Sequence, residues 1–237
     1  MAASAQSLQA SSAGVLMRLW RSSLGKKYVM AITGVILFGF VVGHMLGNLQ
    51  IFAGPTQINE YADALKSNLP LLWGVRLALL AAVALHIVAG VQLALANRRA
   101  RPARYSKNKI LDSTLANRTL IISGLVILAF VIFHLAHFTA GVVDTSYLAL
   151  RDVAGRHDVR SMMIKGFQNP FVSVFYIVSV GLLCLHLSHG VASAFQSVGA
   201  RSKKTERSFK RAALSAAILL FAGFASIPVA VLAGLVK

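Results

Sequence analysis

The chain contains one cysteine, Cys184, and only seven acidic residues among its 237. A lone cysteine excludes a disulfide framework within the chain and any zinc or iron–sulfur site built from cysteines. Charged residues make up 13% of the sequence, against about 25% in soluble domains, and 57% of the residues are hydrophobic. These shortages argue against a soluble enzyme, a disordered tail and a small secreted scaffold.

Apolar stretches long enough to cross a membrane occur five times. A membrane-spanning helix needs about 20 mainly apolar residues. None of the stretches alternates between apolar and polar residues, as the strands of a membrane barrel would. The sequence therefore predicts an all-α integral membrane bundle of five transmembrane helices, in a single domain over residues 25–237 that follows a flexible segment at 1–24. The spans are expected at 28–52, 71–96, 119–143, 171–198 and 212–236.

Basic residues are distributed unevenly around these spans. Seventeen of the 24 Lys and Arg residues lie before the first span, between the second and third, or between the fourth and fifth. The positive-inside rule therefore places the N-terminus and these two loops in the cytoplasm and the C-terminus outside. Because the cations lie at span ends, the net charge of +17 indicates loops that face the lipid bilayer and no nucleic-acid partner.

Six of the seven histidines lie in or at the ends of the expected spans, whereas all seven acidic residues lie in the loops. An imidazole in hydrocarbon needs a polar partner, and no span offers a carboxylate. Coordination of a metal or a haem would satisfy imidazoles, and helix bundles often hold cofactors between facing helices. The six are His44, His86, His134, His137, His186 and His189.

Glycine and histidine recur at matching distances, which indicates a weak tandem repeat of spans 1–2 and 3–4. A glycine lies ten residues before the histidine in the first and third spans, and four residues after it in the second and fourth. A glycine one turn from a histidine leaves room for a flat macrocycle, although close helix packing is the alternative. The pairs are Gly34 with His44, Gly124 with His134, His86 with Gly90, and His186 with Gly190.

Depth in the membrane matches these histidines to one another. At 1.5 Å per residue, His44 and His134 lie about 25 and 24 Å beyond the last cation before their spans. His86 and His186 lie about 18 and 22 Å before the basic loops that follow them, nearer the cytoplasm. The sequence therefore predicts an outer bis-histidine site from His44 and His134 and an inner one from His86 and His186. A bis-histidine haem has no open coordination position, which favours electron transfer over ligand binding.

Two further histidines leave alternatives open. His189 is an alternative ligand to His186, which is preferred because its spacing to Gly190 repeats that of the second span. His137 is interpreted as an interfacial histidine. Zinc is the alternative metal, but no cysteine or acid joins these histidines.

Several short motifs resemble one known family. The chain is similar to the dihaem cytochrome b membrane-anchor subunit of succinate:quinone oxidoreductases, that is, of succinate dehydrogenase or fumarate reductase, in its single-subunit five-helix form. The similarity covers roughly residues 22–200, and the fifth span fits by position only. The motifs are Gly25-Lys26-Lys27 leading to Thr33-Gly34, Gly43-His44-Met45-Leu46-Gly47-Asn48-Leu49, Asn59-Glu60-Tyr61-Ala62, Pro70-Leu71-Leu72-Trp73, and His186-Leu187-Ser188-His189-Gly190 with Ala194-Phe195-Gln196.

This resemblance implies an electron-transfer subunit of an enzyme complex in the bacterial cytoplasmic membrane. It implies two non-covalent haem b groups, with His44 and His134 as ligands of the outer haem and His86 and His186 as ligands of the inner one. The implied partners are an iron–sulfur subunit and a flavoprotein, which hold the iron–sulfur clusters, the FAD and the dicarboxylate site. The electron carrier in the membrane is a quinone, expected to be menaquinone.

Other positions carry more specific expectations. Cys184 stands where some family members have a glutamate linked to proton movement, so this resemblance gives no proton path there. Glu60 is a candidate for an outer quinone site or a solvated loop acid. Arg76 either pairs with an outer-haem propionate or reaches the interface as an anchor. Lys27 and Arg118 have the same two options at the inner haem.

Two other functions stay open at this point. A dihaem anchor of another quinone-linked oxidoreductase, such as a hydrogenase, would differ in its partners. A haem-free transporter or structural anchor would use its histidines as proton relays. A transporter is typically marked by acidic residues or broken helices at mid-membrane, and the sequence suggests neither.

Overall fold

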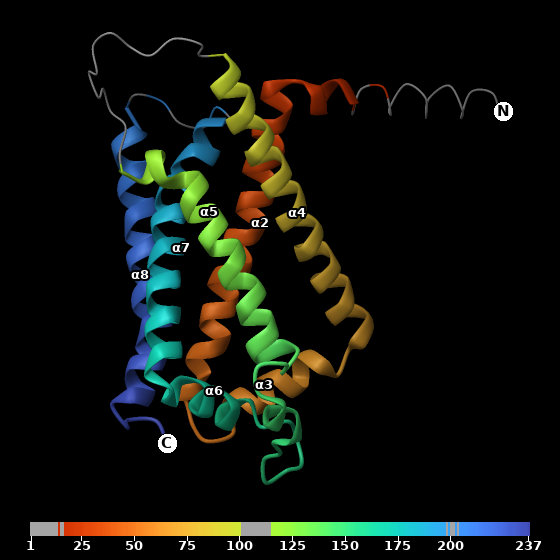
Figure 1. The fold of residues 1–237 in the computed structure, drawn as a ribbon, viewed down its shortest axis with the longest axis vertical. Helices are drawn as coiled ribbons and strands as arrows, with labels where there is room; N and C mark the ends of the chain where they lie inside the picture. The colour runs from red at the N-terminus through yellow and green to blue at the C-terminus, as the bar shows by residue number, and fades with distance from the viewer. Residues whose placement is uncertain (1–13, 15–16, 101–114, 198, 200–201, 203) are drawn as a thin grey trace, which may run out of the picture.

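The computed structural model describes residues 14, 17–100, 115–197, 199, 202 and 204–237, and over these residues it contains helices and no strands (Figure 1). Within this described part, five helices are long and apolar enough to cross a membrane, which confirms the expected number of spans. Most of the segment 1–24, expected to be flexible, lies outside the described residues, and residues 17–21 are helical. The spanning helices are α2 (Ser23–Leu49), α4 (Leu69–Arg99), α5 (Leu115–His134), α7 (Pro170–Ser197) and α8 (Glu206–Leu232).

Side-chain caps determine where the helices begin. The Ser22 hydroxyl accepts a hydrogen bond from the Gly25 amide at 2.9 Å, and the Asn68 side chain accepts one from the Leu71 amide at 3.0 Å. Each bond satisfies one of the amides that a helix N-terminus leaves without a partner. Because these caps precede the apolar stretches, α2 begins five residues and α4 two residues before the expected spans.

Two helices end earlier than expected, because a glycine turns the chain in each case. The third span ends in a π-helical turn, η2 (Leu135–Thr139), and Gly141 follows with φ of +64°. Helix α8 ends at Leu232, and Gly234 follows with φ of +70°. Glycine adopts this left-handed conformation readily and commonly terminates helices. The apolar residues beyond these turns had extended the expected spans too far.

Helices α2 and α7 form the centre of the bundle (Figure 1). Helix α4 packs on α2, α5 packs on α7, and α8 packs on both central helices. Helices α2 and α8 approach closely at Gly223, where a Cβ atom would overlap the side chain of Met45. Many apolar side chains on the outer faces stay exposed, such as Leu77 and Ile122 at 60% and 65%. Such faces suit contact with lipid.

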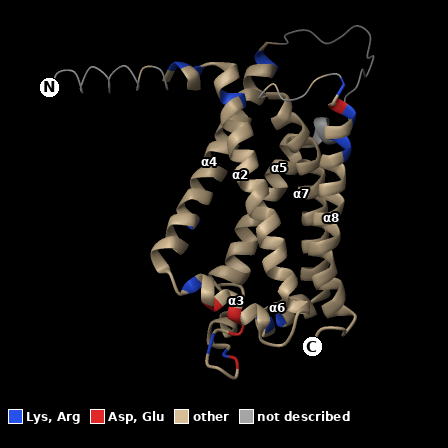
Figure 2. Ribbon diagram, turned by 180° about the vertical axis from the view of Figure 1, so that it is seen from behind, with Lys and Arg blue, Asp and Glu red and all other residues tan. Residues whose placement is uncertain are grey.

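The two ends of the bundle differ in structure and charge. Figure 2 shows cations gathered at the end where α2 and α8 begin and α4 finishes. The opposite end is closed by three short helices that we call the cap: α3 (Gln57–Lys66), η3 (Thr145–Ala149) and α6 (Val159–Gln168). Apart from Glu206, the acidic side chains of the described part lie at or near this cap. This asymmetry matches the charge pattern of the sequence.

Candidate bis-histidine sites

His86 on α4 and His186 on α7 face each other across the bundle. Their ring centres lie 6.5 Å apart, with an angle of 61° between the planes. His86 Nδ1 lies 3.0 Å from the Thr33 hydroxyl of α2, and His186 Nδ1 lies 3.2 Å from the Ser123 hydroxyl of α5. The inner pair therefore takes one ring and one hydroxyl from each half of the repeat.

These hydroxyls determine which imidazole nitrogen is free. Thr33 donates its own proton to the Val29 carbonyl at 2.7 Å, and Ser123 donates to the Leu120 carbonyl at 3.1 Å. Each hydroxyl oxygen then accepts from the Nδ1–H of its histidine. The Nε2 atom keeps its lone pair, which is the form of imidazole that binds a metal.

Glycines give both rings of the inner pair room beside the neighbouring backbone. A Cβ atom on Gly34 would lie 3.4 Å from His86 Cε1, and one on Gly124 would lie 3.9 Å from His186 Cε1. One turn beyond each histidine, a Cβ on Gly190 would meet nothing within 4 Å, and one on Gly90 would meet only the end of Met30. The space expected from the glycine pattern is therefore open beside Gly190, whereas the end of Met30 lies beside Gly90.

The outer pair joins His44 on α2 with His134 on α5. Their ring centres lie 5.7 Å apart, with an angle of 83° between the planes. Phe40 stacks on His44 at 5.3 Å, and Phe224 of α8 lies 6.0 Å from the same ring. Phe130 lies 6.0 Å from His134. Aromatic rings thus pack against both histidines of this pair.

Tyr176 of α7 connects the outer pair to a third histidine. Its hydroxyl lies 3.0 Å from His137 Nδ1 and 3.4 Å from His134 Nδ1. His137 is 2% exposed, so its side chain is buried within the protein at the end of the third span. The π-helical turn places it against Phe138, and Gly166 of α6 admits both rings because a Cβ there would lie 2.7 Å from Phe138.

The ring separations of the two pairs are close to those of a bis-histidine metal site. Two imidazoles on opposite sides of one metal ion, with metal–nitrogen bonds of about 2 Å, have ring centres roughly 6 to 6.5 Å apart. The inner pair has this separation, and the outer pair is slightly closer. In the described part, no group of three or more His, Cys, Asp or Glu side chains could hold a metal. A haem needs only two protein ligands, whereas structural zinc takes four.

The remaining candidates occupy varied positions. His189 lies beside Ser193 of its own helix, with Nε2 3.1 Å from that hydroxyl, while His186 is the histidine beside His86. Arg76 lies over the Trp73 ring at 5.1 Å, near the end of α4 that meets the cap. Lys27 is exposed on the first turns of α2. The side chain of Arg118 lies outside the described residues.

Glu60 belongs to a polar network in the cap. Its carboxylate lies 3.4 Å from the Arg156 guanidinium, which also pairs with Asp152 at 2.8 Å. The neighbouring Asn59 is 1% exposed and donates to Asp158 at 3.0 Å. The loops of the two repeat halves are thereby joined.

The same network lowers the pKa values of two carboxyl groups. Burial alone would raise the pKa of Asp158, but hydrogen bonds from Ser161 and Asn59 outweigh burial and hold this pKa below its ordinary value. Burial likewise opposes the shift at Asp152, where hydrogen bonds from Arg156 and from the Ala154 amide lower the pKa. Both carboxylates are therefore held in the charged form at neutral pH.

Sequence reasoning missed the polar partners of the histidines. Thr33 and Ser123 directly precede the repeated glycines, so a hydroxyl residue at the same place in both halves was the available signal. Tyr176 had no such signal, because it contacts His134 and His137 only through the fold.

Comparisons of the chain with protein-family models, curated proteins and solved structures give no match. The geometry of the sites therefore carries the functional argument.

Proposed function

We propose that this chain is a dihaem cytochrome b membrane anchor that passes electrons between an iron–sulfur subunit and a membrane quinone. The observation that carries the proposal is the presence of two facing histidine pairs at different depths. Each histidine of the inner pair has its Nδ1 engaged by a hydroxyl, which leaves Nε2 for a metal. Neither pair includes a carboxylate or a thiolate.

His44 and His134 would hold the outer haem, and His86 and His186 the inner one. Bound haem supplies a centre that gains and loses one electron. The protein's own residues orient the rings: Thr33 and Ser123 fix two of them, and Tyr176 contacts a third. Ligand orientation and hydrogen bonding of this kind tune a redox potential.

The two sites are separated along the membrane normal. Gly34 lies beside His86 and precedes His44 by ten residues on the same helix, which is a rise of about 15 Å. The hydrocarbon core is about 30 Å thick. Two centres at this separation would form a path across much of the membrane, in a bacterial cytoplasmic membrane under this proposal.

Within this class we favour the anchor of a succinate dehydrogenase or fumarate reductase. The support is the set of family-like motifs, which fall at the two sites and in the cap. The dicarboxylate chemistry, the FAD and the iron–sulfur clusters would then belong to partner subunits. Menaquinone is the quinone we propose, and Glu60 beside buried Asn59 is the candidate contact at the outer side.

Haem content tests the first part of this proposal. The full chain, purified in detergent from cells with adequate haem supply, is expected to contain about two b haems per chain by spectrum and haem assay. Replacing His44 or His134 with Ala should remove one haem, and so should replacing His86 or His186. His157→Ala, in the loop before α6, is the matched control and should retain both.

Each other result has a defined meaning. A monodisperse sample without haem would contradict the proposal and favour a transporter or a structural anchor. If His189→Ala loses the inner haem and His186→Ala keeps it, the ligand is His189 and not His186. Reduction of the haems by succinate in the purified complex is expected. Reduction by hydrogen instead would assign the anchor to another oxidoreductase.

A further inference from the structure

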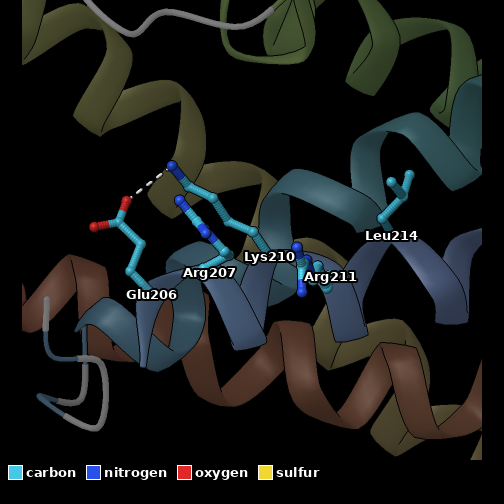
Figure 3. A pocket seen from close by; sticks show the side chains of 5 residues that line it. All are labelled: Glu206, Arg207, Lys210, Arg211 and Leu214. Atoms are coloured by element: carbon cyan, nitrogen blue, oxygen red, sulfur yellow. Dashed lines mark ion pairs between the residues drawn. The ribbon is translucent and has the colours of Figure 1, made fainter. Parts of the chain in front are cut away.

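A hollow with two adjoining parts lies on the surface at α8, and its second part extends between α7 and α8. Its first part, of about 410 Å³, lies at the start of α8 and is lined by four charged residues and Leu214 (Figure 3). Its second part, of about 450 Å³, is apolar and lies between the two helices. Leu214 lines both parts, so the charged end leads directly into the apolar groove.

Helical spacing explains this change of character. One face of α8 carries residues spaced three or four apart along the chain. They are Arg207, Arg211, Leu214, Ile218 and Phe221. From Arg207 to Phe221 this face is about 21 Å long. Its apolar part, from Leu214 to Phe221, covers about 10 Å, which fits within one bilayer leaflet.

The facing side of the groove belongs to α7. Val178, Leu185 and Gly181 line it, and a Cβ atom on Gly181 would lie 3.5 Å from the Phe221 ring. A Cβ at this distance would make ordinary contact with Phe221, so a side chain larger than alanine at position 181 would fill the groove. Val178 and Leu185 are 56% and 52% exposed, so they stand at an open surface rather than in a packed core.

Positive charge dominates the first part of the hollow. The Glu206 carboxylate pairs with the Lys210 ammonium at 2.8 Å, as Figure 3 shows, which offsets one cation. Arg207 and Arg211 leave this end with two net positive charges. Guanidinium groups bind phosphate oxygens well, and basic pockets beside membrane helices attract anionic headgroups.

We propose that this hollow binds an anionic phospholipid. The phosphate lies among Arg207, Lys210 and Arg211, and one acyl chain lies along the groove between α7 and α8. The charged end selects an anionic headgroup, and the open apolar groove gives the chain a defined track. This inference does not depend on haem binding, because none of the residues that line the hollow belongs to a histidine pair.

Native mass spectrometry of the full chain tests this site. The probes are dioleoyl phosphatidylglycerol and dioleoyl phosphatidylcholine, which have the same acyl chains and differ in headgroup charge. The wild type should retain phosphatidylglycerol in preference. The double variant R207Q/R211Q should retain it roughly 25-fold less, since each of the two lost cations contributes about fivefold near a membrane surface.

Two matched variants separate this site from general surface charge. R98Q/R99Q removes two arginines from the last turn of α4, which lies at the same basic end of the bundle. We expect it to change lipid retention less than about twofold. Gly181→Phe keeps every cation but fills the groove, and it should also lose the lipid. Helix content and a single monomer peak report that each variant is folded.

Three outcomes would overturn the proposal. Equal losses in the two arginine variants would mean diffuse attraction to the basic end. Equal retention of the two lipids would mean no headgroup selection. A dimer that dissociates in Gly181→Phe would mean that a second copy of the chain occupies the groove.

Discussion

At the inner pair, one nitrogen of each imidazole is hydrogen-bonded to a hydroxyl group. That hydroxyl is also hydrogen-bonded to a backbone carbonyl of its own helix. Thr33 and Ser123 each bond a backbone carbonyl of the preceding turn and a histidine on another helix. The two proton positions are then determined together, because a hydroxyl has only one proton to donate. A small polar side chain can thus orient a metal ligand inside a membrane.

Ser123→Ala should weaken the inner site alone. His186 loses the acceptor for its Nδ1 proton, and partners of this kind typically change ligand affinity by about 10- to 100-fold. Haem transfer to excess apomyoglobin measures this loss. Ser226→Ala is the control, because Ser226 also bonds its own helix, at the Gly223 carbonyl. Equal haem loss in the two variants would contradict the role of Ser123.

Tyr176→Phe should act at the outer pair and on folding. The change removes a hydroxyl that contacts His134 and buried His137. An unsatisfied buried group costs about 1–3 kcal/mol, so thermal unfolding in detergent should shift accordingly. One component of a redox titration should shift as well. Tyr147→Phe is the control, since the ring of Tyr147 packs 5.8 Å from His137. An unchanged titration would leave Tyr176 a structural role only.

At the scale of elements, the π-helical turn after α5 is the main irregularity of the spans. It carries His137 and Phe138 into the contact with α6. Helix α6 can accept these rings because it has glycine at position 166. The turn and the cap therefore depend on one another.

Gly166→Ala should destabilise this contact. The new Cβ would lie 2.7 Å from Phe138 and 3.2 Å from His137, which requires the rings to move. Overpacking of this kind costs about 1–3 kcal/mol, measurable as a lower thermal midpoint. Gly39→Ala is the matched control in α2, where a Cβ meets nothing within 4 Å. A Gly166 variant as stable as this control would mean that the turn repacks freely.

The cap should loosen in acid. The folded pKa values of Asp152 and Asp158 lie below their ordinary values, so the two carboxylates stabilise the folded cap above the unfolded pKa, about 3.9. That contribution is lost as the pH falls from about 4 through the folded pKa values. Hydrogen exchange at the first amides of α6, corrected for intrinsic rates, should stay constant from pH 7 to 5 and accelerate below 4.

A charge-free variant checks the cause. Asp158→Asn removes one titrating group, so its cap should show a weaker dependence on pH. Amides in the middle of α8 serve as the internal reference, because this helix is remote from the network in sequence and forms its own backbone bonds. An equal acid response in the variant would assign the effect to another group.

The spans and the depths of the paired histidines could be predicted because each is a property of a single helix. Apolar length defines a span, and the rise per residue gives a histidine its depth. The ends of the third and fifth spans were misplaced because Gly141 and Gly234 act through backbone conformation that an apolar pattern does not record. The burial of His137 could not be predicted either, because it requires a ring contact with residues of a different helix.

At the scale of the molecule, charge asymmetry and site depth share one axis. Cations gather at one end, the cap closes the other, and the histidine pairs lie between them. The proposed electron path would therefore run between a basic end that can attract an acidic partner and a cap that joins both loop regions. The proposed lipid site also lies at the basic end, so lipid and partner would approach the same face of the membrane.

The orientation of this axis is the last prediction. The positive-inside rule places the basic end in the cytoplasm and the cap with the C-terminus outside. Alkaline phosphatase, which is active only outside the cytoplasm, should be active when fused after Lys237. A green fluorescent protein fused there should stay dark. The matched control is fusion after Lys204, in the loop before α8, where the two reporters should exchange behaviour. The opposite result at both points would invert the bundle and place the inner histidine pair nearer the outside.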